Sequence, residues 1–224
     1  TKKEAIKKVE TIVVGVGYPE TWRDYGRYTV SATDAYANLV AGEKAEYAHQ
    51  LAKIGKPLDK GEWWMVPQTV NAVNLPVQNA LNFPAAILQP PFFNAKADPA
   101  YNYGAIGAVI GHEISHSFDN NGAAFDASGA LRNWWTAADL AKFNAAGAAL
   151  AAQYDTYKPF ADLAVNGKLT LGENIADVAG LQAAYDAYRA SLKGQEAPVI
   201  DGFSGDQRFF IAYAQTWATK MRDE

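Results

Sequence analysis

The chain has 224 residues, of which 49% are hydrophobic and 12% aromatic, enough to bury a substantial core in one domain with an attached segment. A net charge of −4 and the lack of a basic face argue against nucleic acid as a partner, and no stretch is apolar for long enough to span a membrane. Without cysteine, the chain forms no disulfide bond, and only histidine and carboxylate side chains remain as strong ligands for a transition metal.

The first part of the chain predicts two helices followed by two short strands. The helices are expected over residues 1–14, where a basic amphipathic pattern is broken by Gly15 to Pro19, and over residues 31–54. The strands are expected over 68–75 and 79–83, on either side of a proline-containing turn.

The rest of the chain predicts four helices joined by loops rich in glycine, asparagine, aspartate and proline. Their expected ranges are about 101–119, 136–157, 170–192 and 206–221. The expected fold is therefore α+β and mainly α-helical.

The first of these four helices contains His112, Glu113 and His116 in the pattern His-Glu-x-x-His. With about 100° between successive residues, the histidines lie about 40° apart on one face, so both imidazoles can bind one zinc ion. Glu113 lies to the side, where it suits a general base that takes a proton from a water molecule at the metal. The pattern alone also arises by chance on solvated helix faces.

A zinc site with two histidines needs a third protein ligand. Glu173 is the best candidate, and Asp177 lies four residues later on the same helical face. One carboxylate can bind the metal while the other holds the second nitrogen of a ligand histidine. Asp119, three residues after His116, could orient that histidine in the same way. The alternative is that all three are ordinary surface carboxylates near helix ends.

Four longer blocks of sequence carry a family resemblance. They are VNAVNLPVQNALNFPAAILQPPFF (70–93), YGAIGAVIGHEISHSFDNNGAAFDASGALRNWW (103–135), GENIADVAGLQAAYDAY (172–188) and FFIAYAQTWATKMRDE (209–224). With the weaker match GYPETWRDY (17–25), they cover nearly the whole chain and resemble, in order, the neprilysin and endothelin-converting-enzyme family of zinc metallopeptidases, particularly its bacterial members.

The resemblance implies a thermolysin-like zinc peptidase catalytic domain, with a short edge-strand hairpin beside the active-site helix. His112, His116 and Glu173 would bind one Zn²⁺ per chain, and Glu113 would be the catalytic base. Asp177 and Asp119 would hold the ligand histidines from behind.

The resemblance also implies substrate-binding positions. Asn71 and Ala72 would bind the peptide backbone as an added strand. The pocket for the residue after the scissile bond would be formed by Ile87, Phe92, Ala108, Val109 and Trp217. From the residues alone, Asn71 could equally be a turn or edge-strand residue without a substrate, and the apolar residues could belong to the core.

The implied function is that of a zinc-dependent endopeptidase that hydrolyses peptides on the amino side of bulky hydrophobic residues. The family continues past residue 224, with a histidine and an arginine that stabilise the transition state and bind the substrate carbonyl. The alternative is therefore a catalytically impaired fragment that binds zinc and peptides.

The same resemblance sets the expected domain organisation. Residues 1–30 would be a helical segment from the end of the family's cap domain, and residues 31–224 a catalytic domain that is incomplete at its C-terminal end. Peptide substrates and the remaining segments of the same polypeptide would be its partners. The resemblance favours an extracytoplasmic location, periplasmic or secreted, which the residues themselves do not decide.

Overall fold

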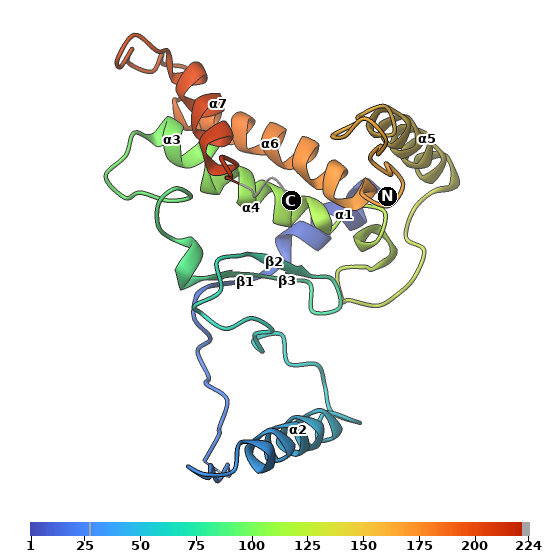
Figure 1. The fold of residues 1–224 in the computed structure, drawn as a ribbon. Coiled ribbons are helices and arrows are strands. Elements are labelled where there is room, and N and C mark those ends of the chain that lie inside the picture. Colours follow the sequence, from blue (N-terminus) through green and yellow to red (C-terminus); the bar gives the residue numbers. More distant parts are fainter. Residues whose placement is uncertain (27, 221–224) are drawn as a thin grey trace.

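The computed structural model describes residues 1–26 and 28–220. Within these residues the fold is mainly helical with a three-stranded sheet (Figure 1), which confirms the predicted fold class. The helices are α1 (Lys2–Glu10), α2 (Ala35–Leu51), α3 (Pro99–Gly104), α4 (Ile106–His116), α5 (Ala137–Tyr154), α6 (Leu171–Ser191) and α7 (Gly205–Thr216), and the strands are β1 (Val13–Gly17), β2 (Val73–Leu75) and β3 (Ala80–Pro84). Two 3₁₀ turns, η1 (Ala85–Ile87) and η2 (Gly122–Ala124), complete the list.

The sheet has the strand order β1-β3-β2. The central strand β3 runs parallel to β1, with Val13 opposite Ala80, and antiparallel to β2, with Val73 opposite Asn82. All five residues of β3 are buried, as expected of a central strand. The predicted hairpin is therefore confirmed, with a first strand shorter than expected, and β2 is an edge strand of the described sheet.

The prediction of one helix over residues 1–14 is wrong for its last four residues, because α1 ends at Glu10 and Val13 begins a strand. Val13, Val14 and Val16 are β-branched residues that favour extended backbone. They pair with β3, which lies far along the chain. The hydrophobic pattern of the N-terminal residues alone therefore does not predict this strand.

Two apolar clusters form the core. The first joins β3, η1 and α4 and contains Ala72, Leu81, Phe83, Ile87 and Ile106. The second joins α3, α4, α6 and α7 and contains Ala100, Ala108, Ala184, Tyr188 and Phe209.

The single helix predicted over 101–119 is divided into α3 and α4 at Ala105, whose backbone angles are φ −90° and ψ −95°. Gly104 lies directly against α7, because a Cβ atom there would stand 2.0 Å from the carbonyl oxygen of Phe209. After the break, the Ile106 N–H donates to the carbonyl of Phe92 rather than to its own helix. Helix α3 is thus held by its contact with α7, and the start of α4 is held by the hydrogen bond to Phe92.

Helices α4 and α6 lie side by side (Figure 1) and approach closely at two glycines. A Cβ atom on Gly111 would stand 2.3 Å from the carbonyl oxygen of Gly180, and one on Gly180 would stand 2.3 Å from the backbone nitrogen of His112. Only residues without a side chain permit this spacing.

The remaining predicted helices are found as α2, α5, α6 and α7. No residue of α2 is buried, and this helix stands apart from the others in Figure 1. Helix α7 ends at Thr216, so the prediction of a helix is wrong for residues 217–220, and residue 221 lies outside the described residues. Among the described helices, none combines the length and hydropathy needed to cross a membrane.

The expected division between residues 30 and 31 stays a prediction. In the structure, α1 and β1 are joined to the rest of the fold by the β1–β3 pairing and by the buried side chain of Lys8, which is 1% exposed.

Candidate metal centre

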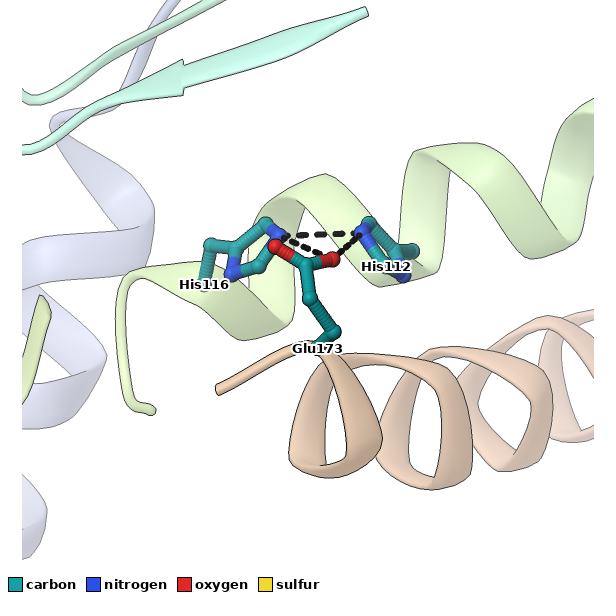
Figure 2. Close-up of side chains that lie close together, drawn as sticks. All are labelled: His112, His116 and Glu173. Carbon is teal, nitrogen blue, oxygen red and sulfur yellow. Dashed lines mark hydrogen bonds and ion pairs between the residues drawn. The ribbon is translucent and has the colours of Figure 1, made fainter. Parts of the chain in front are cut away.

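The structure brings together the three side chains predicted to bind a metal. His112 and His116 project from α4 toward Glu173 in the first turn of α6 (Figure 2). The two Nε2 atoms lie 2.9 Å apart, and Glu173 Oε2 lies 3.3 Å from His112 Nε2 and 3.5 Å from His116 Nε2. All three potential ligand atoms fall within 4.8 Å of one another.

The second ring nitrogen of each histidine lies against one of the predicted carboxylates. His112 Nδ1 lies 2.8 Å from Asp177 Oδ1, and His116 Nδ1 lies 2.7 Å from Asp119 Oδ2. Because an ionised carboxylate only accepts hydrogen bonds, each Nδ1 carries the proton and donates it.

This arrangement fits a cation at the centre. In the neutral imidazoles, the proton on Nδ1 leaves a lone pair on each Nε2, and both lone pairs meet beside the Glu173 carboxylate. Three electron-pair donors at such distances repel one another unless a positive charge lies between them. Two histidines and one glutamate form a ligand set typical of catalytic zinc. The Glu173 side chain is 69% exposed, so the centre is open to solvent on that side.

Asp119 is held firmly in its orienting position. Its other oxygen, Oδ1, accepts hydrogen bonds of 2.7 Å from the N–H groups of Asn121 and Gly122. Burial alone would raise the pKa of Asp119, but the bonds from His116, Gly122 and Asn121 outweigh it, and the pKa lies below its usual value. Asp119 therefore remains a carboxylate that can hold His116.

The pKa of His116 moves in the opposite direction. Burial by itself lowers it, but the hydrogen bond to Asp119 and the nearby carboxylates of Glu173 and Glu113 raise it above the usual value. In the absence of a metal, His116 thus holds a second proton more readily than an ordinary histidine.

Glu113 lies beside the histidines and is only 6% exposed. Burial raises the pKa of its carboxyl group, and the two histidines only partly oppose this effect. Glu113 lines the same cavity as His112, His116 and Glu173, so a water molecule there can contact both the Glu113 carboxyl group and the centre.

This cavity has a volume of about 420 Å³ and is bounded on one side by the segment that leads into β2. Asn71 and Ala72, the two predicted backbone-binding residues, both line it, Asn71 exposed and Ala72 buried. They lie just before β2 rather than within it, since this strand begins at Val73.

Asn74 is a site residue that the sequence analysis missed. Its Nδ2 donates to the Glu113 carbonyl at 2.7 Å and to Ser117 Oγ at 2.8 Å, and it thereby ties β2 to α4. A single asparagine between the apolar residues Val73 and Leu75 is the signal that could have identified it.

The five residues predicted for an apolar pocket do not line the cavity around the metal centre. Ile87 belongs to the first apolar cluster, and Phe92 and Val109 pack against it. Ala108 belongs to the second cluster, and Trp217 is 56% exposed at the end of α7, against Tyr213. Their role in a substrate pocket stays a prediction.

Comparison with known protein families finds a match that spans the candidate centre. The family model described as Peptidase family M13 matches residues 71–224, which include all three potential metal ligands.

Curated relatives match over the whole chain. Neprilysin-11 of Caenorhabditis elegans is 39% identical over 100% of this chain and 28% of its own length. Human endothelin-converting enzyme-like 1 is 36% identical over 100% of this chain and 30% of its own length. The chain therefore spans less than a third of the length of these two relatives.

Solved structures also match nearly the whole chain. A crystal structure of the Mycobacterium tuberculosis zinc metalloprotease Zmp1 in complex with an inhibitor gives a TM-score of 0.94 at 48% identity, over 99% of this chain and 35% of that one. The structure of PepO from Lactobacillus rhamnosis gives a TM-score of 0.83 at 42% identity, over 99% of this chain and 34% of that one.

Proposed function

The chain belongs to peptidase family M13, whose neprilysin and endothelin-converting-enzyme relatives it matches over its full length, and from this membership we propose that it carries the catalytic centre of a zinc-dependent endopeptidase. Its fold is the thermolysin-like fold of this family's zinc peptidases. The observation that carries the proposal is the meeting of three electron-pair donors, from His112, His116 and Glu173, in a cavity that also contains Glu113.

In this proposal, His112, His116 and Glu173 hold one zinc ion, and Asp177 and Asp119 fix the imidazoles so that each Nε2 faces the metal. Zinc, when bound, supplies Lewis acidity to the scissile carbonyl and makes water more acidic. Glu113 accepts the proton of the attacking water on its carboxylate and delivers it to the leaving amine.

The substrate is proposed to be an extended peptide with a bulky hydrophobic residue after the scissile bond. The support is the position of Asn71 and Ala72 at the rim of the cavity, directly before β2, a strand whose outer edge is free within the described sheet. A peptide backbone can bind to such an edge, with the exposed Asn71 side chain as an additional partner. Family membership supports the preference for bulky residues.

The test measures metal and turnover on the same preparations. The wild-type chain is expected to retain one zinc ion per chain after dialysis and to cleave an internally quenched peptide, with activity lost to a chelator and restored by zinc. Glu173→Gln is expected to lose most of the zinc and the cleavage. Glu196→Gln, at an exposed carboxylate on the loop after α6, is the control that should change neither.

Three results separate the possibilities. Zinc binding that does not depend on Glu173 would contradict the ligand set. Zinc binding and peptide binding without cleavage would support a catalytically impaired, peptide-binding chain instead. The absence of zinc from the wild-type chain would overturn the proposal as a whole.

A further inference from the structure

Lys8 is an unusual residue for a buried position. Its side chain is 1% exposed, and its Nζ donates hydrogen bonds to three main-chain carbonyls, those of Ser117 at 2.6 Å, Gly122 at 2.8 Å and Phe125 at 2.7 Å. These bonds use all three protons of the ammonium group. Burial lowers the pKa of Lys8 to about 8, so the ammonium form still prevails at pH 7.

The three carbonyls belong to one segment, residues 117–125, which follows directly after α4. The Ser117 carbonyl is at the C-terminal end of this helix, where a positive charge is favourable. The ring of Phe118 lies beneath the ammonium group, 5.5 Å from Nζ. A residue of α1 thus fixes the course of the chain where it leaves the metal-binding helix.

This segment also carries the residue that orients His116. The Gly122 carbonyl accepts from Lys8, the Gly122 N–H donates to Asp119 Oδ1, and Asp119 Oδ2 accepts from His116 Nδ1. Three hydrogen bonds therefore connect Lys8 with a proposed zinc ligand.

Close packing leaves the residues of this hydrogen-bonded series little room to move. A Cβ atom on Gly122 would stand 1.8 Å from the carbonyl oxygen of His116, so the turn lies directly on the end of α4. A shift of Gly122 would move Asp119, and with it the proton-accepting oxygen behind His116.

We propose that Lys8 is a positioning residue of the metal centre, which acts on His116 through Gly122 and Asp119. The inference rests on the proposed zinc site and adds to it a residue from the first helix of the chain. A structural role alone would only require Lys8 to attach α1 to the fold. A positioning role requires in addition that its effect on zinc affinity depends on Asp119.

The experiment is a double-mutant cycle on zinc affinity, measured in competition with a chelator, with thermal unfolding of each metal-free variant recorded alongside. Lys8→Met is expected to weaken zinc binding roughly 10- to 100-fold, as loss of a residue that supports a metal ligand does in other proteins. In the Asp119→Ala background, the same substitution is expected to weaken it at most about threefold further.

Two control variants distinguish an effect of Lys8 on the position of His116 from a general weakening of the contacts between α1 and the rest of the fold. Lys7→Met changes an exposed lysine on the same helix and should leave zinc affinity unchanged. Asn79→Ala removes hydrogen bonds from Asn79 Nδ2 to the Lys8 carbonyl and to Thr11 Oγ1, so it loosens α1 without touching residues 117–125. It should lower the unfolding temperature but not the zinc affinity.

The absorption spectrum of bound Co²⁺ gives a second readout, because it should change in Lys8→Met and not in Asn79→Ala. If Lys8→Met does not fold, Lys8→Gln, which keeps two donors, enters the same cycle. Unchanged zinc affinity, full additivity with Asp119→Ala, or an equal loss in Asn79→Ala would each overturn the inference. If the wild-type chain itself binds no zinc, the proposed function and this inference both fail, whereas the results listed before overturn the inference alone.

Discussion

Gly180 lies so close to His112 that a Cβ atom at residue 180 would stand 2.3 Å from the His112 backbone nitrogen. The contact joins α6, which carries Glu173, to α4, which carries both histidines. The spacing of the two helices, and therefore the distance from Glu173 to the imidazoles, depends on the absence of a side chain at this point.

The substitution Gly180→Ala is therefore expected to force the helices apart. Overpacking of this kind destabilises proteins by about 1 to 3 kcal/mol, and here it should also weaken zinc binding. Thermal unfolding and zinc titration of the variant check both effects.

Gly147→Ala is the matched control for this substitution. Gly147 also lies within a helix, but a Cβ atom there would meet only Leu171 Cδ2, at an ordinary 3.5 Å. Replacing glycine by alanine in a helix should then stabilise the chain by up to about 1 kcal/mol. Similar behaviour of the two variants would mean that the helix crossing does not set the geometry of the site.

Glu113→Gln is expected to keep zinc and to lose peptide hydrolysis by at least about 100-fold, because the amide preserves the shape of the side chain but cannot take a proton from water. Zinc content and turnover are measured on one preparation. Activity within a few-fold of wild type would assign the base to another group.

Asp177→Asn is expected to weaken zinc binding about 10- to 100-fold, since it removes the carboxylate that accepts from His112 Nδ1 at 2.8 Å. Asp186→Asn, on the exposed part of the same helix, is the control. If the two variants bind zinc equally well, the contact between Asp177 and His112 has no role in holding the metal.

Zinc affinity should fall when the pH drops below the pKa of His116, which lies above 6.5, the usual value for histidine. The Nε2 atom of His116 must lose its proton to bind metal, and the neighbouring carboxylates hold that proton to a higher pH. Affinity is therefore expected to be full above the raised pKa of His116 and to drop about tenfold per pH unit below it. Zinc titrations between about pH 5 and pH 9 check this.

The metal-free chain should show the opposite trend in stability. The favourable interaction of protonated His116 with Asp119 is fully present below pH 6.5 and is lost as the pH rises through the raised pKa of His116.

Asp119→Asn removes the interaction between Asp119 and protonated His116. In this variant, the pH at which zinc affinity begins to fall should therefore be lower. No change in this pH would show that Asp119 does not set the pKa of His116.

Asn71→Ala is expected to raise the KM for a peptide several-fold and to leave zinc affinity unchanged, because Asn71 borders the cavity but is not one of the three potential metal ligands. Steady-state kinetics on one quenched peptide measure the effect, with Asn144→Ala, at an exposed residue of α5, as the control. An unchanged KM would remove Asn71 from the substrate site.

Several features of the centre could be predicted because they depend on local chain geometry. A spacing of four residues is enough to place His112 and His116 on one face of a helix, and a spacing of three places Asp119 near His116. The contact between Glu173 and these histidines is a tertiary one, and it could be proposed only from the ligand chemistry and the family resemblance.

Other features depend on contacts between distant segments, which no local pattern reveals. The strand character of Val13 and Val14 arises from pairing with β3, and the break at Ala105 arises from the packing of Gly104 on α7. The role of Lys8 depends on carbonyls more than a hundred positions away, and a basic amphipathic helix would ordinarily keep that lysine in solvent.

The central place of β3 limits how far the chain can be shortened from its N-terminal side. The family model begins at residue 71, but a chain that began there would lack β1 and Lys8. The side of β3 now paired with β1 would then expose unpaired N–H and C=O groups, an arrangement that promotes strand-to-strand aggregation. For protein production, the N-terminal boundary should therefore be set before α1, well ahead of residue 71, where the family model begins.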